Sequence, residues 1–492
     1  MSTSSELGPA SWAPGRVPRL AVRTVDLPPN ALSTSPADVR RFLTVLADAL
    51  TARVVPAAHG SGTVPGSTPN APGAPARGSA VPTGFATWWR DGEGLVARGE
   101  AARLATPTSA RRTTAERWDA LVARCEVTDD VGRPGTGLVA FGSFAFDDAS
   151  AHGGTLVVPA VLLGHRDGRS WLTTTVPLDR REDGVLTEEV LRTETEHALA
   201  VCAGWDGAPP YGSPGSVVED VPRDDWREVV RAALAAIDAG EAEKVVAARA
   251  LTARAERAID PAWLVDRLAP AYPECWTFSV DGLVGATPEL LVRLCGSDVT
   301  SRVLAGTLPR TPDDGDLAGA HLFASAKDRA EHEFAVASVV ASLRAVCDEV
   351  TSPRQPFPLV LPNVVHLASD VRGTLGSRWS GPERPSAALR VAAAMHPTAA
   401  VCGTPTDAAT AVIRRIEGMD RGRYAGPVGW LDARGDGEWG IALRSAELDP
   451  ADATRVRLFA GCGIVAGSDP DAELRESEAK LVPLREALGI GG

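Results

Sequence analysis

The sequence lacks the features that mark membrane-spanning, secreted and nucleic-acid-binding proteins. No apolar run approaches the roughly 18 residues that a membrane-spanning helix needs. The first 19 residues contain no basic start followed by an apolar core, so no secretory signal is visible. Positive charge is in the minority, with 50 lysines and arginines against 63 acidic residues and a net charge of −13. Because the two signs are interspersed, no surface for DNA or RNA is expected.

Cysteine is scarce and carries no recognisable pattern. The seven cysteines are scattered, odd in number and never spaced as Cys-x-x-Cys. This argues against a zinc site and a disulfide framework, and it indicates reduced thiols in a cytoplasmic protein. Neither a GxGxxG pattern nor a P-loop follows an expected strand, so a bound nucleotide has no support.

The chain does have an ordinary globular composition, with 492 residues, 44% of them hydrophobic and 23% charged. This length is enough for one large or two medium domains. Residues 56–84 are rich in Pro, Gly, Ser, Thr and Ala and have almost no large apolar residue, which predicts a flexible loop. We therefore expect a variable N-terminal segment at 1–84 and a folded domain at 85–492.

Expected helices and strands are mixed along the chain without a strict βα repeat. Apolar spacing predicts helices at 39–50, 114–122, 226–239 and 261–268. Strands are expected in a strand–turn–strand unit that begins at Phe85, and at 138–147, 155–163, 244–249 and 277–280. This mixture predicts a large α+β or mixed α/β fold, and neither a repeat protein nor a Rossmann unit.

A strongly charged stretch at 326–333 runs directly into an uncharged one at 334–343. Helical spacing places four apolar residues on one face, Val336, Val340, Leu343 and Cys347. Glu331 lies off that face, in line with three small residues, Ala335, Ser338 and Ser342. Small side chains would let another group approach the helix closely. A carboxylate at such a position is usually only solvated or ion-paired, so this stretch alone does not define a site.

Lys244 and Glu289 both stand beside apolar runs. A lysine at the start of a strand usually extends its ammonium group to water. If Lys244 is buried instead, desolvation disfavours its charged form and makes it a candidate general base. A carboxyl group between apolar neighbours, such as Glu289, can stay protonated and donate a proton. For each residue taken alone, a structural role is the simpler interpretation.

Two further patterns lie near the C-terminus. Glu473, Glu476 and Lys480 share one face of a predicted helix, which on its own is most often a surface ion-pair ladder. The preceding apolar strand contains Gly461 and Gly463. Two glycines in a strand indicate either a bulge or the close approach of the backbone to another group, such as a ligand carboxylate.

Nine motifs follow one another in a characteristic order, at 285–291, 304–307, 327–333, 366–367, 396–398, 426–430, 437–439, 443–444 and 461–465. Their order resembles that of the chorismate-utilising enzymes, which include isochorismate synthase, salicylate synthase, anthranilate synthase component I and aminodeoxychorismate synthase. The resemblance is strong over 225–488, weaker over 85–165 and absent before residue 85. One departure is Ala326, where close relatives often have glutamate.

The resemblance implies a single large α/β (α+β) fold of the anthranilate synthase component I type, with an extended antiparallel sheet and a cleft that binds chorismate and Mg²⁺. It assigns the metal to Glu331 and Glu476, with Glu333 and Glu473 as partners of the metal's ligands or of its bound waters. Carboxylate oxygens suit Mg²⁺, which keeps several waters. It assigns substrate binding to Ala305, Gly306, Thr307, His366, Thr398, Ala400, Tyr424, Arg444, Gly461, Gly463 and Lys480.

Members of this family differ in their nucleophile, and individual positions indicate which one is used. Water needs a general base, and Lys244 matches the lysine with that role in isochorismate and salicylate synthases, whereas anthranilate synthases have glutamine there. Ala305 occupies the position of the covalent lysine of aminodeoxychorismate synthase and cannot act as a nucleophile. Glu289 then matches the general acid that protonates the departing 4-hydroxyl group. The resemblance therefore predicts an isochorismate synthase, an isomerase that feeds menaquinone or siderophore biosynthesis.

Two alternatives stay open at this point. A salicylate synthase would go on to eliminate pyruvate, and the salicylate-forming relatives have threonine at the position of Ala400. A non-catalytic chorismate-binding paralogue would be expected to lose Lys244, Glu289, Glu331 or Glu476, and all four are present. With water as nucleophile we expect no glutamine amidotransferase subunit, and we expect a cytoplasmic monomer.

Overall fold

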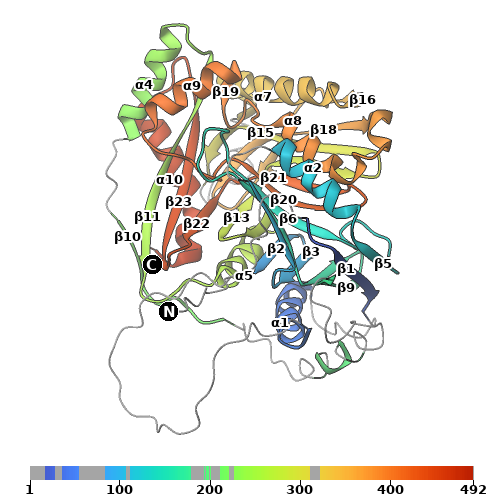
Figure 1. Cartoon of the computed structure of the whole chain (residues 1–492). Helices are drawn as coiled ribbons and strands as arrows, with labels where there is room; N and C mark the ends of the chain where they lie inside the picture. Colours follow the sequence, from blue (N-terminus) through green and yellow to red (C-terminus); the bar gives the residue numbers. More distant parts are fainter. Residues whose placement is uncertain are drawn as a thin grey trace, which may run out of the picture.

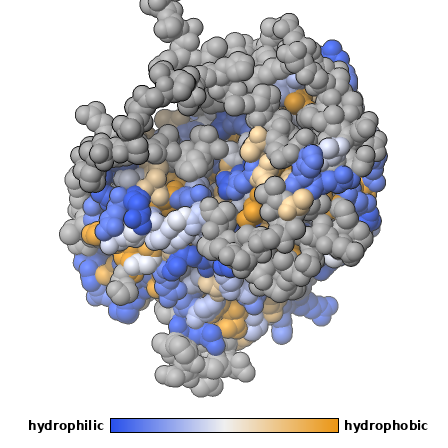
Figure 2. Space-filling view, turned by 90° about the horizontal axis from the view of Figure 1, so that it is seen from below, coloured by the Kyte–Doolittle hydropathy of each residue, from blue (hydrophilic) through white to orange (hydrophobic). Residues whose placement is uncertain are grey.

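Two large sheets dominate the computed structural model of the protein (Figure 1). The structure describes residues 17–27, 36–54, 84–106, 111–178, 211–220, 226–310 and 322–490, with a few isolated positions between 193 and 200. Residues 56–83 of the predicted flexible loop lie outside the described residues. Figure 2 shows one face of the molecule, on which hydrophobic residues form small groups between hydrophilic ones.

The first sheet has 13 strands, nearly all antiparallel, and only the pair formed by β1 and β5 among the described strands of this sheet is parallel. Its strand order is β10 (Val217–Glu219), β11 (Lys244–Ala255), β23 (Asp452–Val465), β22 (Ser445–Asp449), β13 (Leu283–Thr287), β12 (Trp276–Val280), β2 (Phe85–Arg90), β3 (Glu93–Arg98), β8 (Val161–Arg166), β9 (Arg169–Pro177), β1 (Leu20–Asp26) and β5 (Glu126–Asp129), with β19 (Gly403–Thr404) paired to β11.

The second sheet has 10 antiparallel strands. Its order is β16 (Cys347–Thr351), β18 (Val364–Leu375), β15 (Asp298–Pro309), β14 (Leu290–Cys295), β21 (Gly437–Ile441), β20 (Pro427–Asp432), β6 (Val139–Phe144), β7 (Gly154–Val158) and β4 (Ala102–Thr106), with β17 (Phe357–Val360) paired to β18. The predicted α+β class is confirmed, although the extended antiparallel structure is divided between two sheets.

Large aromatic residues pack the two sheets against each other. Trp88 and Phe278 of the first sheet share one buried cluster with Phe141 and Trp430 of the second. A buried carboxylate, Glu438 on β21, bridges the same interface. The indole N–H groups of Trp88 and Trp276 donate to its Oε2 at 2.9 and 3.2 Å, and Arg166 donates to its Oε1 at 3.1 Å.

Helices cover the sheets outside this interface (Figure 1). In the first sheet, α1 (Pro36–Val54) packs on β3 and β8, α5 (Pro261–Ala271) on β12 and β13, α4 (Trp226–Asp238) and α9 (Thr406–Ile416) on β11, and α10 (Pro470–Leu488) on β23. In the second sheet, α7 (Ala326–Arg344) lies on β15 and β18, and α8 (Ala387–Met395) lies on β14 and β21 beside α2 (Arg111–Val122). Two short 3₁₀ turns, Ser377–Ser380 and Arg384–Ser386, precede α8.

The predicted strand at 155–163 is wrong in one respect, because the stretch forms two strands. β7 ends at Val158 and β8 begins at Val161. Pro159 lies between them and has no backbone N–H with which to continue a ladder. β7 pairs with β6 in the second sheet, whereas β8 pairs with β3 in the first. The chain therefore passes from one sheet to the other at this proline.

The buried face of α7 also differs from the prediction. The fully buried residues are His332, Ala335, Val339 and Leu343, whereas Val336 and Val340 are only partly buried. Cys347 lies beyond the helix, on β16. The sequence offers two adjacent apolar stripes, and packing against β15 and β18 selects the one that contains the histidine, which bonds to Ser369 on β18.

Part of the predicted N-terminal segment belongs to the first sheet. β1 pairs with β9 and β5, and α1 buries Leu43, Leu46 and Leu50 against β3 and β8. Among the helices that the structure describes, none combines the length and apolar character needed to cross a membrane.

Candidate active site

Thirteen of the seventeen predicted site residues line one cavity of about 60 Å³ between the two sheets. They come from elements on both sides of it, mainly β15, β18, β23, α7 and α10. The lining residues are Glu289, Ala305, Gly306, Thr307, Glu331, His366, Ala400, Tyr424, Arg444, Gly461, Gly463, Glu476 and Lys480.

Lys244 and Glu331 form a buried ion pair at the edge of this cavity. Lys244 begins β11 and is fully buried, and its Nζ lies 3.0 Å from Oε1 of Glu331. Glu331 lies near the start of α7, whose N-cap, Ser325, accepts a hydrogen bond from the N–H of Asp328. The cap fixes where the helix begins, and therefore how far Glu331 reaches toward β11.

Gly463 makes this pair possible. A Cβ at position 463 would lie 2.4 Å from Oε1 of Glu331 and 3.1 Å from Cε of Lys244. The glycine on β23 pairs with Val246 on β11, directly beside the lysine. Of the two interpretations of the strand glycines, close approach by another group therefore applies here.

Glu289 lies between β13 and β14, with its side chain buried at the cavity. Burial raises the pKa of its carboxyl group to about 8, although the positive charges of Lys244, Arg444 and Lys480 oppose the shift. At neutral pH the group is therefore mainly protonated, and it can donate a proton inside the cavity.

A bulge in β15 shapes another wall. The pairing of β15 with β18 shifts register between Ala305 and Thr307, and Gly306 adopts a left-handed conformation with φ +79°. A Cβ at position 306 would lie 3.1 Å from Cβ of Asp328 on α7. Glycine tolerates the left-handed conformation and has no Cβ to contact Asp328, so α7 can approach β15 closely.

His366 and Arg444 form a buried polar chain with Thr307. Arg444 donates from Nη2 to Nε2 of His366 at 3.0 Å, and Nδ1 of His366 lies 3.0 Å from Oγ1 of Thr307. Burial and the nearby arginine hold the pKa of His366 well below its usual range, so the ring is neutral. Since the guanidinium can only donate, Nε2 is the acceptor and the ring proton is on Nδ1. Arg444 makes no ion pair with any described residue, which leaves a buried positive charge facing the cavity.

The C-terminal helix α10 supplies the opposite wall. Asp469 caps its start, Pro470 occupies its first position, and Gly489 ends it in a left-handed conformation. Lys480 donates to Oε1 of Glu476 at 2.6 Å and to the carbonyl of Gly461 at 2.9 Å. The side chains of Lys480 and Glu476 are only 11% and 21% exposed, so they do not form a surface ladder.

Acidic oxygens gather here in a way that fits a hard cation. Ligand atoms of Glu473, Glu476 and Cys462 lie within 4.8 Å of one another. Burial raises the pKa of the Cys462 thiol well above its usual range, so it stays protonated and is a poor ligand. The two carboxylates remain, and Glu331 lines the same cavity. Such an all-oxygen set suits Mg²⁺.

Four predicted residues do not line the cavity. Lys244 contacts it through Glu331, and Glu473 through Glu476. Thr398 is buried outside the lining. Glu333 is exposed, because two residues along a helix from Glu331 correspond to about 200° of rotation and the side chain points away from the cavity.

The sequence interpretation missed a buried ion pair behind the cavity. Arg421, which lines the cavity, bonds to the carboxylate of Glu417 and donates to the carbonyls of Val401 and Val246 at 3.0 and 2.6 Å. Glu417 in turn accepts from the N–H of Ala248 at 2.7 Å. The pair therefore fixes β11 behind the site. Its only sequence signal is an i, i+4 spacing of opposite charges, which is commoner on surfaces.

Comparisons with known proteins identify relatives of the chain. The sequence profile of the family described as chorismate binding enzyme matches residues 76–489. The chain is 39% identical to isochorismate synthase DhbC of Bacillus subtilis over 288 residues, which are 56% of this chain and 70% of that protein. It is 31% identical to isochorismate synthase MenF of Bacillus subtilis over 372 residues, which are 72% and 75% of the two chains.

A solved structure shows the same fold. The menaquinone-specific isochorismate synthase MenF of Escherichia coli matches with a TM-score of 0.68 at 24% identity, covering 96% of this chain and 95% of that one.

The protonated state of Glu289 predicts a pH dependence of stability. Because its folded pKa, about 8, exceeds the ordinary value of 4.5, the stability given by the neutral carboxyl is fully present below pH 4.5 and is lost as the pH rises through 8. We expect Glu289→Gln, which cannot ionise, to gain free energy of unfolding relative to the wild type between pH 5 and pH 9. Denaturant titrations at several pH values measure this difference. Glu486→Gln, at an exposed position of α10, is the control, and parallel pH curves for Glu289→Gln and the wild type would contradict the assignment.

Proposed function

The chain belongs to the family of chorismate binding enzymes, and on this basis we propose that it is an isochorismate synthase. Water adds to ring carbon 2 of chorismate while the 4-hydroxyl group leaves, so the reaction is an isomerisation. The observation that carries the proposal is the position of two buried groups, Glu289 in the lining of the cavity and Lys244 at its edge in contact with Glu331. The neutral amine of Lys244, once it is released from its ion pair with Glu331, takes the proton from the attacking water. Glu289 gives its proton to the departing 4-hydroxyl group, which leaves as water.

The buried polar chain of Thr307, His366 and Arg444 suits the substrate. Chorismate carries two carboxylates, and Arg444 offers a buried fork of donors with no ion-pair partner in the described part of the chain. Its bond to His366 fixes the guanidinium in place, and the bond of His366 to Thr307 fixes the ring. Tyr424 and the backbone around Gly461 and Gly463 complete the cavity that encloses the ring.

Glu331 and Glu476 are the residues that would hold Mg²⁺, and Glu473, beside Glu476, would contact these ligands or the waters bound to the ion. When bound, this ion supplies positive charge that holds the substrate's ring carboxylate. The structure places Lys244 and Lys480 in contact with Glu331 and Glu476, so positive charge already lies beside these carboxylates. Glu333 is not included in this set, because its side chain is exposed on the other side of α7.

The alternatives differ in what they require of the cavity. A salicylate synthase must also hold the enolpyruvyl side chain for elimination, and Ala400 leaves this part of the wall small. A non-catalytic paralogue would not need Glu289 in the lining of the cavity and a buried lysine at its edge. Because water is the nucleophile, no ammonia-supplying subunit is required. We propose that the protein acts as a monomer in the cytoplasm. The isochorismate formed would enter menaquinone or siderophore biosynthesis.

Replacing the general base is a direct test of the mechanism. We expect Lys244→Ala to reduce the turnover of chorismate by about 10²-fold or more, because the water then lacks a positioned proton acceptor. Chorismate affinity, measured by titration calorimetry, should change far less. Arg254→Ala removes a positive charge from the exposed end of the same strand and should leave turnover intact. Near-normal turnover of Lys244→Ala would refute the role.

The metal proposal predicts a Mg²⁺ requirement that depends on α10. Turnover should stop in EDTA and return with added Mg²⁺. Glu476→Gln should raise the Mg²⁺ concentration needed for half-maximal turnover, since it removes a charged oxygen ligand. Glu486→Gln lies on the exposed side of the same helix and should titrate like the wild type. Activity that persists in EDTA would rule out the metal.

The product distribution separates isochorismate synthase from salicylate synthase. We expect the wild type to interconvert chorismate and isochorismate with little salicylate or pyruvate, measured by chromatography at neutral pH. Ala400→Thr should raise the salicylate fraction, because the added methyl and hydroxyl groups can hold the enolpyruvyl chain against the ring. Overall turnover should fall, since added volume in a packed site is unfavourable. Ala337→Thr, at an exposed position of α7, is the control. Salicylate as the main wild-type product would favour the alternative.

A further inference from the structure

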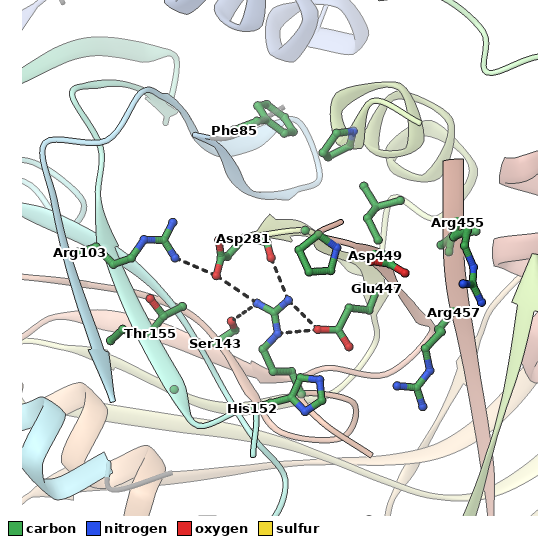
Figure 3. Close-up of a pocket in the computed structure, with 18 of the residues that line it drawn as sticks. Phe85, Arg103, Ser143, His152, Thr155, Asp281, Glu447, Asp449, Arg455 and Arg457 are labelled. Atoms are coloured by element: carbon green, nitrogen blue, oxygen red, sulfur yellow. Dashed lines mark hydrogen bonds and ion pairs between the residues drawn. The ribbon is translucent and has the colours of Figure 1, made fainter. Parts of the chain in front are cut away.

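A second and larger cavity lies away from the proposed active site. Its volume is about 580 Å³, which is in the range of sites for small organic molecules. Its walls come from the start of β2, from β4, β6 and β7, from the turn between β12 and β13, and from β22 and β23 (Figure 3). None of the residues assigned above to catalysis, substrate or metal lines it.

One wall is a complete network of opposite charges centred on Arg423 (Figure 3). Arg423 donates to Oε1 of Glu447 at 2.7 Å and to Oγ of Ser143 at 3.0 Å, and it also donates to the carbonyl of Asp281 at 2.8 Å. The carboxylate of Asp281 pairs with Arg103 at 2.9 Å. The side chains of Arg423 and Glu447 are only 11% and 10% exposed, so this wall is rigid and its charges are already balanced.

Two further arginines on β23 have no such carboxylate partner. Arg455 and Arg457 alternate with buried Val456 on β23, and both belong to the lining of the cavity. In Figure 3 the side chain of Arg457 extends toward the cavity. Within the described residues neither forms an ion pair, and Arg457 donates one long hydrogen bond, of 3.4 Å, to the carbonyl of Asp420. Four arginines stand against three acids, Asp281, Glu447 and Asp449, which leaves a formal charge of +1.

The remaining lining is largely apolar. Phe85 lies across the cavity from the charged network in Figure 3, and the guanidinium of Arg98 lies 4.4 Å from its ring centroid. Leu448, Pro450 and Pro261 add further apolar surface. A ligand that matches these walls has an anionic group at one end and a flat apolar body at the other. A bare inorganic anion would leave the apolar wall uncovered.

We propose that this cavity binds a small aromatic carboxylic acid, with its carboxylate held by Arg455 and Arg457 and its ring against Phe85. Half-buried guanidinium groups are effective carboxylate binders because they offer paired donors in a fixed plane. The ring supplies the apolar contact that gives the site its selectivity over simple anions.

A short stack of rings connects this cavity to the active site. The guanidinium of Arg457 lies 5.0 Å from the ring centroid of Phe459, and that ring stacks on Tyr424 at 4.9 Å with an interplanar angle of 11°. Tyr424 lines the active-site cavity and directly follows Arg423 in the chain. An acid that draws Arg457 toward itself weakens the contact with this stack, so the ligand acts as an effector of chorismate binding. This regulatory part rests on the proposed function, whereas the binding site does not.

Titration calorimetry with benzoate tests the site directly. We expect one benzoate per chain, with no binding of benzamide and weaker binding of inorganic phosphate. The double variant Arg455→Gln, Arg457→Gln should weaken benzoate binding by about tenfold or more, since it removes both charged donors. Arg444→Gln is the matched control, because it removes the free arginine of the active site instead. Its benzoate affinity should match that of the wild type.

Each result of the benzoate titrations either supports or overturns the proposed site. Loss of benzoate binding in Arg444→Gln but not in the double variant would place the acid in the active site and overturn the proposal, as would the absence of binding to the wild type. Phe85→Leu keeps an apolar side chain and removes the ring, so it should also weaken binding if the double variant proves unstable. Regulation is measured separately, as a benzoate-dependent KM for chorismate that is lost in the double variant. If the chain does not convert chorismate, the calorimetric result still decides whether the cavity is a site.

Discussion

The buried carboxylate of Glu438 joins the two sheets, and the geometry between them depends on it. Two indole N–H groups from the first sheet and one guanidinium reach this carboxylate. If the sheets moved past each other, an unpaired charge would be left in the interior, at a cost of about 3–5 kcal/mol. The active-site cavity has walls from both sheets, with β11 and β23 on one side and β15 and β18 on the other. Glu438 therefore helps to hold these walls at their spacing, together with the aromatic cluster between the sheets, although it does not itself line the cavity.

Within that spacing, close approach between backbone and charged side chains creates the site. Gly463 and Gly306 remove Cβ atoms at the places where α7 meets the strands. The space gained is filled by an ion pair, Lys244 with Glu331, rather than by packed apolar groups. Across the cavity, Glu289 is neutral and Arg444 has no counter-ion among the described residues. The cavity thus contains both a proton donor and a positive charge available to an anion, which is the environment that an anionic substrate undergoing proton transfer requires.

The sequence predicts the parts of this arrangement that depend on short motifs, and it misses those that depend on packing. The motifs that contain Glu289, Glu331, Arg444 and Gly463 bring these residues to one cavity, as expected. Glu333 belongs to the same motif as Glu331, yet helix geometry turns it to solvent. The choice between Val339 and Val340 as the buried residue of α7 could not be made from periodicity, because both lie on apolar stripes and only the sheet beneath selects one.

The second cavity could not have been found in this way either. Its arginines come from β4, β23 and the segment before Tyr424, which are distant in sequence and share no motif. No local pattern distinguishes an arginine that pairs with a buried carboxylate, such as Arg423, from one that forms no ion pair with a described residue, such as Arg457. That difference depends on which strands become neighbours in the sheet.

The pairing of β11 with β23 has a consequence for how the protein is made in the cell. Lys244 lies opposite Val465, and the helix that carries Glu476 and Lys480 comes later still. While the ribosome is still translating the region before residue 465, the emerging chain contains Lys244, Glu289 and Glu331 but lacks the strand and the helix that enclose them. The first sheet is also incomplete near one edge, because β11 then has no neighbour on the β23 side. Such a nascent chain exposes an open strand edge and needs protection from aggregation until synthesis of this region is finished.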